Sequence, residues 1–165
     1  MKSSIATVSV SGTLDEKLTA IASAGFDGID LFEPDLIASP MSPREVAARA
    51  ADLGLRIELY QPFRDFEAMP EPLFRRSIRR AAAKFDVMAE LGAHLMLVCS
   101  NVSTDAIDDP DLAAAQLRAL GELAAERDAR IAYEALGWGR HVRHYADSYD
   151  IVRRAEHPAV GLCLD

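Results

Sequence analysis

Two acidic residues, Glu134 and Asp165, each stand at the end of a short apolar run, the first in RIAYE and the second in VGLCLD. Short apolar runs of this kind predict buried strands, where an unpaired carboxylate is costly to bury. If both strands end at the same edge of a sheet, the carboxylates converge and offer the oxygen ligands that Mg²⁺ and Mn²⁺ prefer. The alternative for Glu134 is an ion pair with a neighbouring arginine. The pattern therefore indicates either a divalent-cation site or a structural ion pair.

A candidate anion-binding arginine, Arg64, follows the apolar run 56–63. Its planar guanidinium matches the geometry of a substrate carboxylate or phosphate. The alternative is a salt bridge from Arg64 to Asp65 or Glu67. Glu33, which closes another apolar run, indicates either a ligand contact or an internal ion pair, and the sequence leaves both open.

Further polar candidates follow or flank the same apolar runs. Ser100 and Asn101 come directly after the run HLMLVC, where they either hydrogen-bond a hydroxylated ligand or cap the next loop. Tyr133 and Trp138 flank Glu134 and either wall a ligand pocket or fill the protein interior. We therefore expect Ser100, Asn101 and Tyr133, together with Arg64, to contact the substrate.

The composition argues against several classes of function. The 165 residues carry a formal net charge of −8 and are 50% hydrophobic, which predicts a globular domain without a nucleic-acid partner. No apolar run approaches the roughly 20 residues of a membrane span, and the N-terminus lacks a signal-peptide pattern. Cys99 and Cys163 lie within apolar runs, which indicates reduced, buried thiols. We therefore expect a cytoplasmic protein that does not associate with membranes.

Strand-like and helix-like patterns alternate along the whole chain. Two of the helical segments begin with capping signals, Thr13 with Glu16 and Ser42 with Glu45, the second with Pro43 at the first helical position. The expected strands are 4–10, 28–33, 56–63, 94–100, 130–136 and 160–165. The expected helices are about 14–24, 42–54, 71–91, 109–128 and 145–155. Apolar strands that alternate with helices predict an α/β fold with a parallel sheet.

Two architectures fit this alternation, an open doubly wound sheet and a barrel of repeated βα units. No strand runs into a Gly-x-Gly-x-x-Gly turn, which weakens the dinucleotide-binding form of the open sheet. Polar residues instead gather where strands end, and this is the active-site face of a (β/α)8 TIM barrel. The residues concerned are Glu33, Gln61, Arg64, Ser100, Asn101, Glu134 and Asp165. Because such a barrel has eight strands, we expect residues 1–165 to supply its first three-quarters, truncated after strand six.

The sequence resembles the metal-dependent 3-dehydroshikimate dehydratases of bacteria, which belong to the xylose-isomerase-like (sugar phosphate isomerase/epimerase) barrel superfamily. Two of the matching runs, YEALGWGRHV and QPFRDFE, are specific to the dehydratase branch. The other matching runs are SIATVSVSGTLDEKL, AGFDGIDLFEPDL, ADLGLRIELYQPFRDFE, KFDVMAELG, LMLVCSNVS and HPAVGLCLD. The resemblance therefore spans the chain from its start to its last residue.

The resemblance implies a divalent metal, Mg²⁺, Mn²⁺ or Co²⁺, held by four side chains. Two of these ligands match Glu134 of YEAL and Asp165 of VGLCLD. In the family the other two ligands, a glutamine and a glutamate, come later in the sequence, as does a histidine that acts as base. Some relatives also carry a second domain that resembles 4-hydroxyphenylpyruvate dioxygenase. None of these later parts is present in the 165 residues.

The activity that the resemblance implies is the dehydration of 3-dehydroshikimate to protocatechuate, in the catabolism of quinate and shikimate. A metal that binds the substrate oxygens stabilises the enolate formed in this reaction, and Arg64 is expected to bind the substrate carboxylate. The enzymatic alternative is a sugar or sugar phosphate isomerase or epimerase. The non-enzymatic alternative is an inactive barrel fragment that needs a completing partner, with self-association through its unpaired sheet edges.

Overall fold

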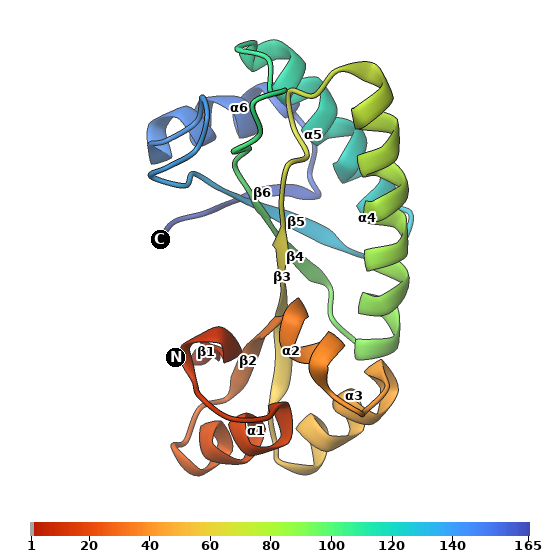
Figure 1. Cartoon of the computed structure of the whole chain (residues 1–165), viewed down its shortest axis with the longest axis vertical. Coiled ribbons are helices and arrows are strands. Elements are labelled where there is room, and N and C mark those ends of the chain that lie inside the picture. The colour runs from red at the N-terminus through yellow and green to blue at the C-terminus, as the bar shows by residue number, and fades with distance from the viewer. Residues whose placement is uncertain (1) are drawn as a thin grey trace. The chain divides into compact units, whose positions relative to one another are not determined.

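The computed structural model describes residues 2–165, which form two compact units. Unit 1 comprises the chain up to Gln61 and the segment Asp86–Leu95, and unit 2 comprises Pro62–Phe85 and Met96–Asp165. Six strands alternate with helices, and the strand order is β1-β2-β3-β4-β5-β6 (Figure 1). The predicted α/β class is therefore confirmed. That residues 1–165 belong to one barrel domain stays a prediction.

Unit 1 contains strands β1 (Ser4–Ala6), β2 (Gly28–Phe32) and most of β3 (Arg56–Phe63), which pair in parallel. The expected strand 4–10 is wrong beyond Ala6, because Thr7–Ser9 form a 3-10 turn. Thr7 is buried, and its hydroxyl accepts a hydrogen bond from the backbone N–H of Phe32 at 3.0 Å. This side-chain contact with the neighbouring strand replaces the continued β-ladder.

The helices of unit 1 are α1 (Leu14–Ser23), α2 (Glu33–Ala38) and α3 (Pro43–Asp52), followed by the last residues of α4. Both expected capping boxes are confirmed. At the start of α1, Glu16 accepts a hydrogen bond from the backbone N–H of Thr13 at 2.8 Å, and Glu45 does the same for Ser42 at 2.7 Å. Helix α2 was not expected. It places Glu33 in a first helical turn, where the Tyr60 hydroxyl lies 3.0 Å from Glu33 Oε1.

Unit 2 holds most of helix α4 (Glu71–Leu91) and strand β4 (Leu95–Cys99), together with α5 (Pro110–Ala125), β5 (Arg130–Glu134), α6 (Tyr145–Ala155) and β6 (Val160–Cys163). Strands β5 and β6 lie side by side in parallel, with Glu134 opposite Cys163 (Figure 1). The bounds of β3, α4 and α6 agree with the expected segments, and the other elements are shorter at one or both ends.

The core of unit 2 includes an aromatic cluster below the loop that follows β3. The ring centroids of Phe63 and Phe66 lie 5.5 Å apart, and those of Phe66 and Phe74 lie 5.7 Å apart. Phe63 and Phe66 have no solvent exposure, so the loop between them is anchored in the interior at both ends. Across residues 2–165, no helix combines the length and the hydropathy that a membrane span requires.

Candidate active site

Glu134, the last residue of β5, lies at the centre of a polar cluster in unit 2. The Cys99 thiol, at the end of β4, donates a hydrogen bond to Glu134 Oε2 with a sulfur–oxygen distance of 3.4 Å. Asp165, two residues beyond β6, and Arg64, directly after β3, both act electrostatically on the Glu134 carboxylate. The structure therefore brings together side chains from the ends of β3, β4, β5 and β6.

Burial and the neighbouring groups shift the pKa of the Glu134 carboxyl in opposite directions. Burial of the half-buried carboxylate raises its pKa, and the negative charge of Asp165 raises the pKa further. The Cys99 thiol and the Arg64 guanidinium act in the opposite direction and lower the pKa. The net result is a pKa above the ordinary value, so Glu134 and Asp165 form a like-charged pair that a bound cation would stabilise.

The donor set fits part of a hard divalent-cation site. Two carboxylates that repel each other at the ends of parallel strands supply the oxygen ligands that Mg²⁺ and Mn²⁺ prefer. Asp165 also lines a cavity of about 280 Å³ with Arg143, His144 and Cys163. Within residues 2–165, no group of three or more histidine, cysteine, aspartate or glutamate side chains could hold a metal.

The four expected substrate contacts differ in accessibility. Arg64 is exposed, and its charge lowers the pKa values of both Glu134 and Cys99, so the guanidinium faces the carboxylate cluster. Ser100, Asn101 and Tyr133 are buried and bonded to protein groups. The Ser100 hydroxyl accepts from the backbone N–H of Leu136 at 2.9 Å, and the other two side chains contact Glu67. The loop-capping alternative describes Asn101, whose Oδ1 accepts from the backbone N–H of Ser103 at 2.8 Å, whereas Ser100 bonds the loop that follows β5.

Glu67 is the residue that sequence reasoning missed, since it was considered only as a partner for Arg64. Its side chain is 2% exposed, and Oε1 accepts hydrogen bonds from the backbone N–H of Asn101 at 2.6 Å and the Tyr133 hydroxyl at 2.9 Å. Burial raises the pKa of Glu67 to about 7. The available signal was its position between the apolar residues Phe66 and Met69, both of which are buried.

The comparisons with known proteins identify the family of the chain. The model of the family described as "Xylose isomerase-like TIM barrel" matches residues 18–165. The chain belongs to the xylose isomerase-like TIM-barrel family. Members of a TIM-barrel family carry their active sites on the loops that follow the strand ends, and the cluster around Glu134 lies at such ends.

Two longer relatives match this chain over only part of their own length. It is 55% identical over 165 residues to the 3-dehydroshikimate dehydratase of Pseudomonas putida, and it covers 26% of that protein. It matches the structure of a xylose isomerase-like TIM barrel/4-hydroxyphenylpyruvate dioxygenase fusion protein with a TM-score of 0.97 at 55% identity, covering 98% of this chain and 26% of the other. The chain thus spans about a quarter of the length of these relatives.

A more distant structure shows the shared barrel fold. The IOLI protein with a bound zinc atom has a TM-score of 0.84 at 20% identity, with 100% of this chain and 63% of that chain covered. This chain and the IOLI protein therefore share a fold.

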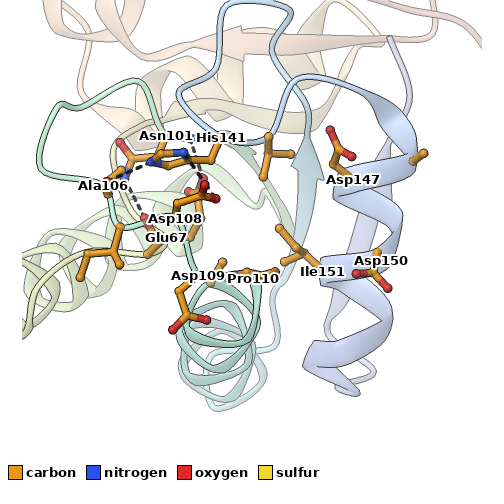
Figure 2. Close-up of a pocket in the computed structure, with 15 residues that line it drawn as sticks. Glu67, Asn101, Ala106, Asp108, Asp109, Pro110, His141, Asp147, Asp150 and Ile151 are labelled. Carbon is orange, nitrogen blue, oxygen red and sulfur yellow. Dashed lines mark hydrogen bonds and ion pairs between the residues drawn. The ribbon is translucent and has the colours of Figure 1, made fainter.

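A separate cavity of this xylose isomerase-like chain lies within unit 2 (Figure 2). It measures about 320 Å³ and is lined by Glu67, Asn101 and the first half of α6. His141 lies at its edge, with Nε2 3.0 Å from the Ala106 carbonyl oxygen and Nδ1 3.6 Å from Asp108.

Trp138 is 71% exposed, so the alternative in which it fills the protein interior is wrong.

Proposed function

We propose that this chain contributes to a 3-dehydroshikimate dehydratase that uses a divalent cation held by Glu134 and Asp165. The observation that carries the proposal is the convergence of Glu134, Asp165 and Arg64 at strand ends in a chain 55% identical to the dehydratase of Pseudomonas putida. Because the chain covers 26% of the length of that relative, the dehydratase activity is part of this proposal.

The cation is proposed to be Mg²⁺, Mn²⁺ or Co²⁺. Support comes from the two carboxylates and from the zinc atom bound to the IOLI protein of the same fold. A divalent cation, when bound, supplies Lewis-acid stabilisation of the negative charge that develops on the substrate oxygens during dehydration. The Cys99 thiol fixes one oxygen of Glu134 from the protein side, which leaves the other oxygen for coordination.

Arg64 is proposed to bind the carboxylate of 3-dehydroshikimate. Its guanidinium is exposed and lies close enough to Glu134 to lower that carboxyl's pKa. A bidentate contact would orient the substrate so that its ketone faces the pair of metal ligands. The group that accepts the substrate proton is assigned to none of the described residues. We further propose that the reaction serves quinate and shikimate breakdown in the cytoplasm, where free thiols such as Cys99 persist.

The test uses the polypeptide as its source cells make it, freed of metal by a chelator. We expect protocatechuate to form from 3-dehydroshikimate only after Mg²⁺, Mn²⁺ or Co²⁺ is added back. Glu134→Gln should lower kcat/KM at least about 100-fold by weakening the metal site. The matched control is Glu126→Gln, because Glu126 is exposed at the end of α5. Turnover that survives chelation or Glu134→Gln, or turnover of a sugar phosphate in place of 3-dehydroshikimate, overturns the proposal.

A further inference from the structure

The loop after β3, residues 64–69, is buried over most of its length although it carries a carboxylate. Phe66, Glu67, Ala68 and Met69 are all buried, whereas Arg64 at the start of the loop is exposed. A loop that is buried must satisfy its backbone polar groups within the protein. The contacts that do so come from three other segments of unit 2.

The first segment follows β4, and the second is β5 itself. Glu67 Oε1 accepts from the backbone N–H of Asn101 at 2.6 Å and from the Tyr133 hydroxyl at 2.9 Å. The Asn101 side-chain amide donates in return to the carbonyl oxygen of Glu67 at 2.7 Å. Asn101 and Glu67 therefore form a reciprocal pair, and one carboxyl oxygen joins the ends of β3, β4 and β5.

The third segment is helix α5, which holds the far end of the loop. Gln116 accepts a hydrogen bond from the backbone N–H of Met69 at 2.9 Å and donates one to the Met69 carbonyl oxygen at 2.7 Å. The backbone N–H of Ile107 donates to the Ala68 carbonyl oxygen at 2.8 Å. The loop is thus fixed on both sides of Glu67.

The backbone of the loop is strained in two places. Asp65 has φ of 55° and Ala68 has φ of 56°, which lie in the left-handed region that residues other than glycine rarely adopt. Such conformations persist only where surrounding contacts hold them, and they cluster at functional sites. Glu67 stands between the two strained residues and makes the side-chain contacts described above.

We propose that Glu67 is a positioning residue: its carboxyl holds loop 64–69 against the segments after β4 and in β5, and so sets the position of the Arg64 guanidinium. The inference rests on the proposed function, in which Arg64 binds the substrate carboxylate. Glu67 itself is 2% exposed, and in this role it acts on the loop. It acts through the two residues that separate it from Arg64, Asp65 and Phe66, of which Phe66 has a buried ring.

The chemistry of the carboxyl suits this role. Oε1 makes both hydrogen bonds, while Oε2 is buried and has no hydrogen-bond partner among the described residues. One acceptor oxygen is therefore sufficient, and the amide oxygen of glutamine can replace it. Alanine removes the acceptor and leaves the Asn101 N–H and the Tyr133 hydroxyl unpaired in the interior. Glu67→Gln removes the negative charge and keeps the acceptor oxygen, whereas Glu67→Ala removes both. The two variants together thus separate the effect of the hydrogen bonds from that of the charge.

The experiment is a double-mutant cycle on the polypeptide as its source cells make it. Arg64→Ala should raise KM for 3-dehydroshikimate about 10- to 100-fold by removing a charge-assisted contact. Glu67→Ala should raise KM about 10-fold with a smaller change in kcat, because a displaced guanidinium binds the substrate less well. Glu67→Gln should stay within about threefold of the unaltered protein. The double variant should be no worse than Arg64→Ala alone.

Two controls keep the result interpretable. Glu71→Ala changes an exposed glutamate at the start of α4, which pairs with Arg75, and should leave KM unchanged. Tyr133→Phe removes a single hydrogen bond to Glu67 and should raise KM by less than Glu67→Ala, which covers the case in which Glu67→Ala fails to fold. The Mn²⁺ dissociation constant should be equal in Glu67→Gln, Glu71→Ala and the unaltered protein, because neither variant alters Glu134, Asp165 or the position of the Arg64 charge.

Each outcome has one meaning. If Arg64→Ala raises KM but Glu67→Ala and Tyr133→Phe do not, or if the Arg64 and Glu67 effects multiply, the positioning role is overturned. If Arg64→Ala leaves KM unchanged, the substrate contact in the proposed function fails, and with it the role of Glu67 in binding. If no variant forms protocatechuate, amide hydrogen exchange decides: Glu67→Ala, unlike Glu67→Gln, should speed exchange at Asn101 and in loop 64–69, and equal rates overturn the proposal.

Discussion

The thiol of Cys99 donates a hydrogen bond to Glu134 Oε2 across the ends of two strands, β4 and β5, at a distance of 3.4 Å. Cys99 is buried, and burial together with the nearby Glu134 charge raises its pKa to about 12, so the sulfur remains a protonated donor. The thiol therefore acts as an orienting group for the carboxylate.

We predict that Cys99→Ala weakens Mn²⁺ binding about 10-fold in the polypeptide as its source cells make it. The physical reason is that a ligand whose hydrogen-bond partner is removed loses its fixed orientation. Cys99→Ser keeps a donor of similar size and should restore most of the affinity. Electron paramagnetic resonance of free Mn²⁺ measures both constants. Equal affinities for Cys99→Ala and the unaltered protein contradict an orienting role.

The 165-residue chain by itself should bind Mn²⁺ weakly and show no measurable dehydratase turnover. The proposed site has two carboxylates, Glu134 and Asp165, for a cation that prefers about six oxygen ligands, and no group of three or more potential ligands occurs within residues 2–165. Isothermal titration with Mn²⁺ and an assay for protocatechuate test the two statements separately. Clear turnover by the purified 165-residue chain would show that two protein ligands suffice.

Stability should depend on pH through Glu67. Burial raises the pKa of this carboxyl from 4.5 to about 7 in the folded protein. Between these pH values the folded protein holds a proton that the unfolded chain has released, so the free energy of unfolding falls as pH rises, by on the order of 3 kcal/mol. Asp65, the charged neighbour that faces the group, acts in the same direction.

Glu67→Gln removes this titration, so its unfolding free energy should vary less between pH 4.5 and about 7 than that of the unaltered protein. Urea unfolding at a series of pH values gives the comparison. Glu71→Gln, in an exposed ion pair, serves as the control and should follow the unaltered protein. If the unfolding free energy of Glu67→Gln falls with pH as steeply as that of the unaltered protein, other groups cause the pH dependence.

Gly139→Ala should destabilise the loop between β5 and α6 by about 1–3 kcal/mol. A Cβ atom at this position would meet the carbonyl oxygen of Val142, and it would lie 2.6 Å from Ser100 Oγ and 3.0 Å from the carbonyl oxygen of Leu136. Gly137→Ala, two residues earlier, meets nothing within 4 Å and is the matched control. Thermal unfolding of the two variants should differ by several degrees, and equal melting temperatures would contradict the close approach.

The sequence predicted those elements whose ends carry local signals. Helix α4 was expected at 71–91 because Gly92 follows it, and this glycine has φ of 67°. Helix α2 was missed because six residues with a proline give no helical periodicity. The strand at 4–10 was over-extended because the hydrogen bond between Thr7 and the distant Phe32 leaves no trace in a local pattern.

The residues of the candidate site also differ in whether a local sequence signal indicates them. Glu134, Asp165 and Arg64 were proposed from the sequence because each ends or follows an apolar run, and the topology of parallel strands brings such positions to one edge. The contact between Glu67 and Tyr133 joins residues 66 positions apart. Its partners are known only once the fold has formed, so no spacing within the sequence indicates it. Candidate ligand contacts at strand ends were thus easier to propose from the sequence than contacts among buried side chains.

Trp138 is the single tryptophan of the sequence, and it lies exposed in the loop that follows Glu134. The backbone N–H of Arg140, two residues later, donates to the Asn101 carbonyl oxygen at 2.6 Å, which couples this loop to the one after β4. The indole ring is therefore a natural optical reporter beside the candidate site. Its emission and its quenching by acrylamide should respond to any cation or small molecule that orders the loop, without a chemical label.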